Sequence, residues 1–179
     1  MRIDVNDRER AVEAIDILND FIGDCVASVN VFRDYWNALK DDASRQNMLV
    51  AVHRLCMSYL LVTLDKWLEF YDRYHGLIPS DLHDECKKLM KELRSRKIED
   101  FRDTCIGHIW NKKTKRPLYS SEIDVALKQI TKGDINGFLK WVNDPNNNVF
   151  PSTIVSIVET VRDRIAREHN IDYQEITSK

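Results

Sequence analysis

Apolar residues recur at every third or fourth position from the start of the chain to about residue 39. This spacing follows the 3.6-residue period of an α-helix, whereas a half-buried strand would show strict alternation. Asn6 is a good N-cap for the segment, and the pattern ends near Leu39. The pattern therefore predicts one long amphipathic helix whose apolar stripe must pack against another element. The stripe contains Ala11, Ile15, Leu18, Ile22, Val26, Val29 and Phe32.

A second long segment follows the polar break at residues 41–44 and runs to about Tyr74. It is apolar on most of its circumference, which is typical of a helix surrounded by neighbours. We expect this helix to be central and buried, and to end before Gly76 and Pro79. Its apolar residues are Leu49, Val52, Leu55, Tyr59, Leu60, Val62, Leu64, Trp67, Leu68, Phe70 and Tyr71.

Shorter segments with a helical period fill the rest of the chain. Among them, residues 111–117 are polar and basic, which indicates an exposed loop. Two short helices near residues 121–142 are expected to be peripheral. The predicted helices are Ser80 to about Arg96, Ile98 to about Ile109, one capped by Ser121, one capped by Asp134, and Pro151 to about His169.

Turn residues are scarce in this chain. Five Gly and four Pro make about 5% of the 179 residues, against about 12% in an average protein. A sandwich or barrel of short strands needs more such residues, and no alternating strand pattern is present in the sequence. We therefore predict an all-α, up-and-down bundle of long antiparallel helices with short peripheral helices. The length fits a single domain over residues 1–179.

Charged residues crowd the first twenty positions and leave no apolar core for a secretory signal. The longest unbroken apolar runs, such as Met48 to Val52, are far shorter than the roughly 18–20 residues of a membrane span. The four cysteines form no CxxC pair, which favours reduced, buried thiols over a disulfide or zinc framework. We expect a cytoplasmic protein with no membrane contact and no cofactor.

The net charge of −2 hides a strong asymmetry along the chain. Residues 87–116 hold eleven Lys and Arg against four Asp and Glu, so this segment carries about +7 and the remainder about −9. Such a contrast is typical of an anion-binding surface on an acidic body. Helices with solvated basic faces are also common, so charge alone leaves both interpretations open.

A guanidinium, a carboxylate and an imidazole lie close together within the basic segment. They belong to Arg102, Asp103 and His108, and a Lys-rich loop ending in Pro117 and Leu118 follows them. This arrangement resembles the HEPN family (higher eukaryote and prokaryote nucleotide-binding), whose small all-helical domains carry Arg, a polar residue and a later His. It is most similar to the abortive-infection-like branch of that family, and the resemblance covers most of the chain.

The resemblance implies a metal-independent endoribonuclease in phage defence or a toxin–antitoxin pair. Arg102 would bind the scissile phosphate, His108 would transfer a proton at the 2′-hydroxyl or the leaving oxygen, and Asp103 would orient one of them. The expected partners are RNA, a second copy of the chain, and an antitoxin such as a nucleotidyltransferase-type protein. The candidate RNA-backbone contacts are Lys112, Lys113, Lys115 and Arg116.

Helix geometry bears on this reading independently. In a regular helix, Arg102 and His108 would point about 120° apart and lie about 9 Å apart along the axis. Both side chains reach one phosphate only if the turn is distorted, for which Gly107 offers freedom, or if a two-fold related copy supplies a second pair. Arg can stabilise phosphate charge, and His can carry a proton near neutral pH.

Other interpretations remain open. Arg102 and Asp103 could be a surface ion pair and His108 a buried imidazole, or the chain could be a helical dimer that binds nucleotide, RNA or protein without catalysis. A metal site at residues 83–86 is a weaker possibility, because no second ligand cluster accompanies it. Trp110 and Tyr119 flank the basic loop and are candidates for base stacking.

Overall fold

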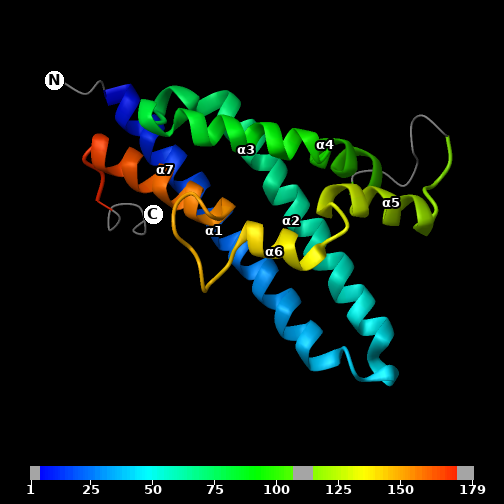
Figure 1. Ribbon diagram of the computed structural model, residues 1–179. Coiled ribbons are helices and arrows are strands. Elements are labelled where there is room, and N and C mark those ends of the chain that lie inside the picture. Colours follow the sequence, from blue (N-terminus) through cyan, green and yellow to red (C-terminus); the bar gives the residue numbers. More distant parts are fainter. Residues whose placement is uncertain (1–4, 107–114, 173–179) are drawn as a thin grey trace.

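The protein is an all-α bundle in which two long antiparallel helices carry the shorter ones (Figure 1). The structure is a computed structural model that describes residues 5–106 and 115–172. Its elements in chain order are α1 (Val5–Leu39), η1 (Ala43–Arg45), α2 (Gln46–Tyr74), η2 (His75–Leu77), η3 (Ser80–Leu82), α3 (His83–Ser95), α4 (Ile98–Phe101), the π-helix η4 (Arg102–Ile106), α5 (Ser120–Thr131), α6 (Ile135–Val142) and α7 (Ile154–Glu168). The predicted fold class is confirmed.

Helices α1 and α2 form a long hairpin, because only a short connection separates two long helices. The connection is short because Asp42 caps the turn: its Oδ1 accepts hydrogen bonds from the backbone N–H of Ser44 at 3.0 Å and from the Ser44 hydroxyl at 2.6 Å. The other helices gather around the end of the hairpin farther from this turn (Figure 1). The turn end of the hairpin therefore projects away from the bundle.

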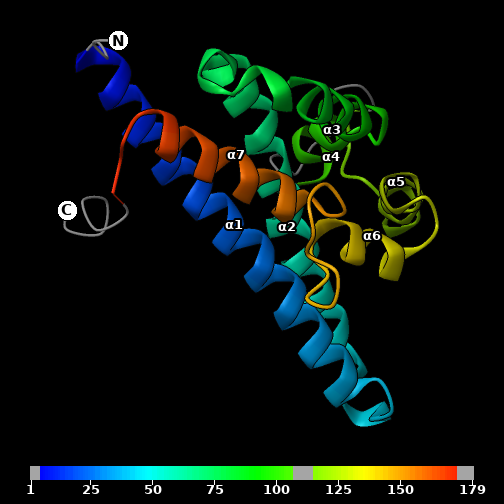
Figure 2. The same ribbon diagram turned by 60° about the vertical axis from the view of Figure 1, so that its left-hand side comes forward.

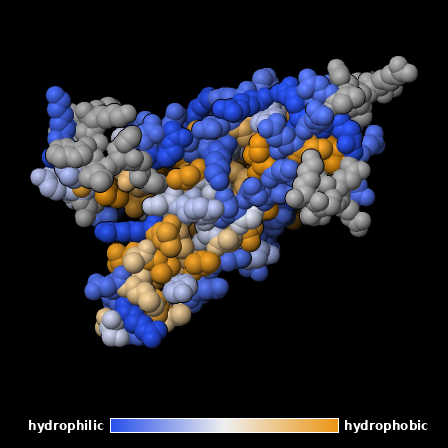
Figure 3. All heavy atoms as spheres, turned by 180° about the vertical axis from the view of Figure 1, so that it is seen from behind, coloured by the Kyte–Doolittle hydropathy of each residue, from blue (hydrophilic) through white to orange (hydrophobic). Residues whose placement is uncertain are grey.

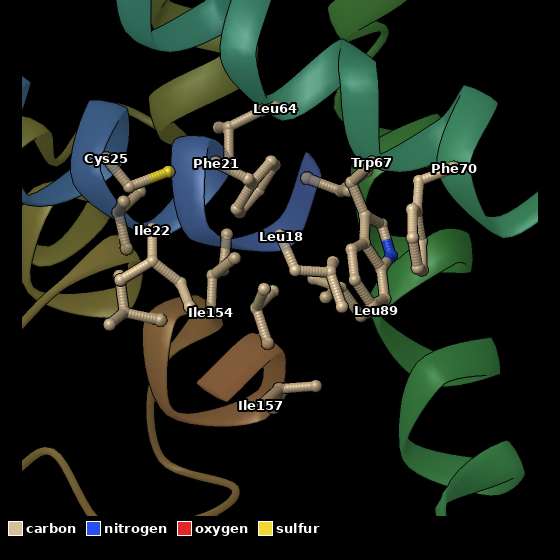
Figure 4. Packing of buried hydrophobic residues seen from close by; sticks show 14 of the residues in the cluster. Leu18, Phe21, Ile22, Cys25, Leu64, Trp67, Phe70, Leu89, Ile154 and Ile157 are labelled. Atoms are coloured by element: carbon tan, nitrogen blue, oxygen red, sulfur yellow. The ribbon is translucent and has the colours of Figure 1, made fainter. Parts of the chain in front are cut away.

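The core lies where the hairpin meets α3 and α7. Trp67 of α2 is fully buried and stands 5.4 Å from the ring of Phe70 and 6.0 Å from that of Phe21 of α1, measured between centroids (Figure 4). Helix α7 runs along the first half of α1 and contributes Ile154 and Ile157 (Figures 2 and 4). The apolar stripes predicted for these helices are the surfaces that meet here.

Two predicted helix starts are displaced by their caps. The helix predicted to follow a Ser121 cap begins at Ser120, because Glu122 accepts the backbone N–H of Tyr119 at 2.8 Å and so places the cap at Tyr119, two residues earlier. The last helix begins at Ile154 rather than at Pro151, because the Thr153 hydroxyl accepts the N–H of Ser156 at 3.0 Å. Asp134 caps α6 as predicted, accepting the N–H of Gly137.

Helix α2 is central, but it is not buried all round. Leu60, Leu64 and Trp67 are fully buried, whereas Leu55 is 70% exposed and Tyr59 is 48% exposed. The expectation of a wholly buried helix is therefore wrong for its first half. The reason is that α3, α4 and α7 reach only the end of the hairpin that lies farther from its turn (Figure 1).

Length and composition alone would allow the helical segment 43–77 to cross a membrane. The core helix of a soluble bundle has the same composition, and the second half of α2 packs against α1 and α3. The absence of membrane contact stays a prediction.

Three of the four cysteines, Cys25, Cys56 and Cys86, are buried thiols, and Cys105 is half-buried. Burial raises the pKa of Cys86 to about 12, so this thiol is protonated and unreactive near neutral pH. This matches the expectation that these residues are small core hydrophobes.

Candidate functional site

The predicted motif begins on a distorted helical turn. Lys97 has a left-handed backbone, with φ of 57°, and ends the run of α3. The next helix, α4, lasts only four residues before the chain widens into the π-helical turn η4 at Arg102. The fourth predicted helix is therefore not a regular α-helix. Single π turns are rare in proteins and often mark functional positions, because they redirect side chains relative to a regular helix.

Arg102 is surrounded by three carboxylates. Its Nη1 forms a close ion pair with Asp65 of α2 and lies 3.7 Å from Glu69. Its Nη2 and Nε donate to the same oxygen of Asp103 at 2.8 and 3.0 Å. The hydrogen bonds to Asp103, together with the nearby charge of Asp65, raise the pKa of Arg102. These contacts fix the orientation of the guanidinium, and the side chain of Arg102 remains about one third exposed.

Asp65 is the buried member of this cluster, only 3% exposed. Burial raises the pKa of its carboxyl group, the guanidinium of Arg102 lowers it, and the neighbouring carboxylates of Glu99, Glu69 and Asp103 raise it again. Sequence reasoning overlooked Asp65 because it treated this helix as apolar. A carboxylate between Leu64 and Trp67 is nonetheless a signal, since buried charges require a partner.

The structure brings Arg102 and Asp103 together and leaves the rest of the motif undescribed. His108, Lys112, Lys113 and Trp110 lie outside the described residues. The expected approach of His108 to Arg102 is therefore untested, and so is the part of the basic loop that these lysines form.

In the described end of the basic loop, Arg116 makes contacts that stabilise the start of α5. Arg116 forms a two-pronged ion pair with Glu122, at 2.8 and 2.9 Å, and its guanidinium carbon lies 4.2 Å from the ring centre of Tyr119. The hydrogen bonds from Arg116 lower the pKa of Glu122 to about 2. By holding Glu122, Arg116 helps to cap α5. A phosphate group would have to compete with Glu122 for the guanidinium of Arg116. Lys115 is exposed.

Part of the basic segment is neutralised within the fold. Arg96 is buried, bonds Glu92 at 2.8 Å and the carbonyl of Ile130, and lies 4.4 Å from the ring centre of Trp141. Lys88 pairs with Glu85 at 2.6 Å. The charge count therefore overstates the anion-binding surface, because the acids that balance these side chains lie nearby in space.

A hollow of about 200 Å³ adjoins the π turn. It lies between α2 and α5, and Phe101 and Cys105 form one wall. The opposite walls carry Met57 and Ser58 of α2 and Ile123 of α5. The lining is partly apolar and partly polar, and the described residues that form it do not include Arg102.

Metal binding finds no support among residues 5–106 and 115–172, which hold no group of three or more potential ligands in range of one ion. At the weaker candidate position, His83 Nε2 lies 2.8 Å from the carbonyl oxygen of Ile78, and Cys86 is buried. His83 therefore has a partner inside the protein, and Cys86 is part of the hydrophobic core.

The fold and the site together describe an all-helical protein with a charged cluster on a π turn. No protein-family model matches the chain, and no curated protein matches it. Among solved structures it is similar to the integron cassette protein Vpc_cass2 from the mobile metagenome of V. paracholerae. The identity is 22%, the TM-score is 0.75, and the match covers 93% of this chain and 99% of that chain. At this identity, the likeness establishes the fold alone.

Proposed function

We propose that this protein is a metal-independent endoribonuclease that acts as a homodimer in the cytoplasm, in phage defence or in a toxin–antitoxin pair. The observation that carries the proposal is the fixed, partly exposed guanidinium of Arg102 on a π turn. His108 follows six positions later, which provides the proton carrier that cleavage at a 2′-hydroxyl requires. This reading also rests on the resemblance to HEPN domains.

The proposed reaction needs no external nucleophile. The ribose 2′-oxygen attacks the neighbouring phosphorus as its proton leaves, the bond from phosphorus to the 5′-oxygen breaks, and the departing oxygen takes up a proton. His108 carries out one of these proton transfers. Arg102 stabilises the charge that grows on the phosphate, and it does so by exchanging the exposed carboxylate of Asp103 for phosphate oxygens while Asp65 keeps hold of Nη1.

The first experiment is incubation of the purified protein with structured and unstructured RNA in excess EDTA. We expect cleavage that leaves 2′,3′-cyclic phosphate ends, and we expect His108→Ala to lose at least about 100-fold in rate. His75→Ala is the matched control, because His75 is exposed at the end of α2 and far along the chain from the motif. Equal cleavage by all three proteins would point to a contaminating nuclease.

A binding protein without catalysis is the second candidate, and one observation favours it. Three carboxylates surround Arg102. Such a cluster is found in structural ion-pair networks as well as in active sites. In that case RNA would be bound and never cut, and Arg102→Lys would change assembly or binding only. Cleavage in EDTA by the wild type and by His75→Ala, but not by His108→Ala, would exclude this candidate.

A further inference from the structure

A hollow of about 330 Å³ lies between the α1/α2 hairpin and the start of α6. Apolar side chains gather on the projecting end of the hairpin when the molecule is seen from behind (Figure 3). The hollow differs from an open apolar surface because a third helix, α6, closes one of its sides. Its volume falls at the lower end of the roughly 300–1,000 Å³ that ligand sites occupy, so it fits a small molecule. The lining includes Phe32, Trp36 and Lys40 of α1, Leu49 and His53 of α2, and Ile135 of α6.

Aromatic rings form one wall of the hollow. The rings of Phe32 and Trp36 are stacked, with centroids 6.0 Å apart and planes 18° from parallel. The imidazole of His53 stands 5.4 Å from the Phe32 ring on the side of α2. Phe32 is buried, whereas Trp36 is 45% exposed, so the neighbouring rings hold the indole in place and leave part of it open. A flat aromatic molecule would gain stacking energy on such an indole.

Lys40 adds a positive charge at the end of the hollow near the hairpin turn. Its side chain is exposed, and no carboxylate among residues 5–106 and 115–172 forms an ion pair with its ammonium group. The nearby Asp42 accepts the hydroxyl of Ser44 and lies 3.6 Å from Arg45. Among the described residues that line the hollow, none is Asp or Glu. An acidic group on a ligand would therefore meet a cation that has no partner within this part of the chain.

His53 is the other titratable side chain of the lining. Burial and the nearby charge of Arg54 lower its pKa, and Asp124 has a smaller opposite effect, so the ring is neutral near pH 7. Its Nε2 is buried and has no hydrogen-bond partner among the described residues, so no acceptor at that atom favours the charged ring. The imidazole is therefore a neutral wall, and Lys40 is the charged side chain of the lining.

We propose that this hollow binds a small planar aromatic acid, with its ring on the indole of Trp36 and its acidic group on the ammonium of Lys40. The apolar side chains of Leu49 and Ile135 cover the ring, which removes apolar surface of the ligand from water. The stacking wall selects a flat ring system, and Lys40 selects an anion over a neutral or cationic analogue. This site shares no residue with the Arg102 cluster, and it does not rest on the proposed nuclease function.

Titration calorimetry on the full chain tests the chemical class of the ligand. The probe is 2-naphthoate, a flat aromatic carboxylate, and we expect a dissociation constant below about 1 mM. Two analogues should bind at least about 3-fold more weakly: 2-naphthamide, which lacks the charge, and cyclohexanecarboxylate, which lacks the aromatic ring. No binding of 2-naphthoate up to about 5 mM, or equal binding of either analogue, would overturn the proposal.

Variants of the two contact residues test the place of binding. Lys40→Gln should weaken 2-naphthoate by about 3–5-fold and leave 2-naphthamide unchanged, because only the acid contacts the ammonium group. Trp36→Leu should weaken both compounds by about 5-fold or more, and Trp36→Phe, which keeps a ring, should lose less. Lys128→Gln on α5 is the matched control, because Lys128 is exposed and lies outside the hollow.

Binding by Lys40→Gln and Trp36→Leu that equals that of the wild type would refute the proposal, since the acid would then occupy another place. An equal loss in Lys128→Gln would also refute it, because the attraction would then be to the net charge of the protein. Circular dichroism should show the same helix content in all variants. No measurement uses RNA, so an empty hollow and an absent nuclease activity give different results.

Discussion

Arg102 is held by charges that differ in their contact with water. Asp65 is buried, so its carboxylate has lost hydration and depends on the guanidinium for compensation. Glu69 and Asp103 are exposed, and solvent screens their attraction to Arg102. Breaking the inner contact should therefore cost stability, whereas the outer contacts can be exchanged for a ligand at little cost.

Replacement of Arg102 by Ala should lower the free energy of unfolding by about 2 kcal/mol at pH 7.5, because it leaves the buried Asp65 unpaired. Burial already holds the pKa of Asp65 above its ordinary value, and loss of the guanidinium raises it further. A carboxyl group whose pKa is higher in the folded state destabilises the protein as the pH rises through that value. The deficit should shrink toward pH 5, as measured by urea denaturation.

The double variant Arg102→Ala with Asp65→Asn provides the control for this measurement. In the Asp65→Asn background, Arg102→Ala should lower the free energy of unfolding by less than it does in the wild type. This loss should not vary between pH 5 and 7.5. If the loss of unfolding free energy is independent of pH in both backgrounds, Asp65 is not the group involved.

Lys115 and Arg116 are neighbours in the chain, but they differ in whether their side chains are free to bind a phosphate. Lys115 is exposed, while Arg116 is engaged by Glu122 and stacks on Tyr119. If the protein binds single-stranded RNA, Lys115→Ala should lower the slope of log affinity against log salt by about 0.7, the value for one phosphate contact. Lys140→Ala, on the distant helix α6, should leave the slope unchanged in the same titration.

Among the helices, Arg96 acts as a clamp. It leaves the end of α3, bonds the carbonyl of Ile130 at the end of α5, and covers Trp141 of α6. Helix α6 buries Phe138, Leu139 and Val142, and α5 buries Ile130, so Arg96 adds a polar attachment to apolar contacts that already hold these short helices.

Arg96→Met should lower the free energy of unfolding by about 2–3 kcal/mol, because it removes two hydrogen bonds and the contact with the Trp141 ring. Hydrogen exchange should accelerate over 120–142 more than in α1. Arg94→Met removes an exposed charge of the same helix and should cost less than about 0.5 kcal/mol. Equal losses in the two variants would contradict the clamp.

In the molecule as a whole, packing is uneven along the hairpin. One end of α1 and α2 is enclosed by α3 and α7, and the other end stands alone (Figures 1 and 2). An isolated pair of helices is marginally stable in water, so the end that stands alone should open more readily than the enclosed end.

For the proposed homodimer, the midpoint of thermal unfolding should rise with protein concentration, by about 2 °C for each tenfold increase, because association stabilises the folded state by mass action. Differential scanning calorimetry from about 5 to 500 μM measures this dependence. A wild-type midpoint that is constant over this range would argue against a dimer.

The helices could be predicted because helical period and capping are local properties of the chain. The bounds of α1 and α2 and the Asp134 cap all follow from residues within a few positions of one another. The motif was found in the same way, as a run from Arg102 to His108. Its π turn was not predicted, because the spacing of apolar residues there fits a regular helix equally well.

The partners of the charged residues depend on how the helices pack. Asp65 and Arg102 are 37 positions apart, and Arg96 and Ile130 are 34 positions apart, so no local pattern pairs them. The same holds for Leu55, whose apolar character predicted a core residue although no helix of the described chain covers it. A period tells which residues share one face of a helix; the packing of the other helices decides whether that face is buried, charged or open.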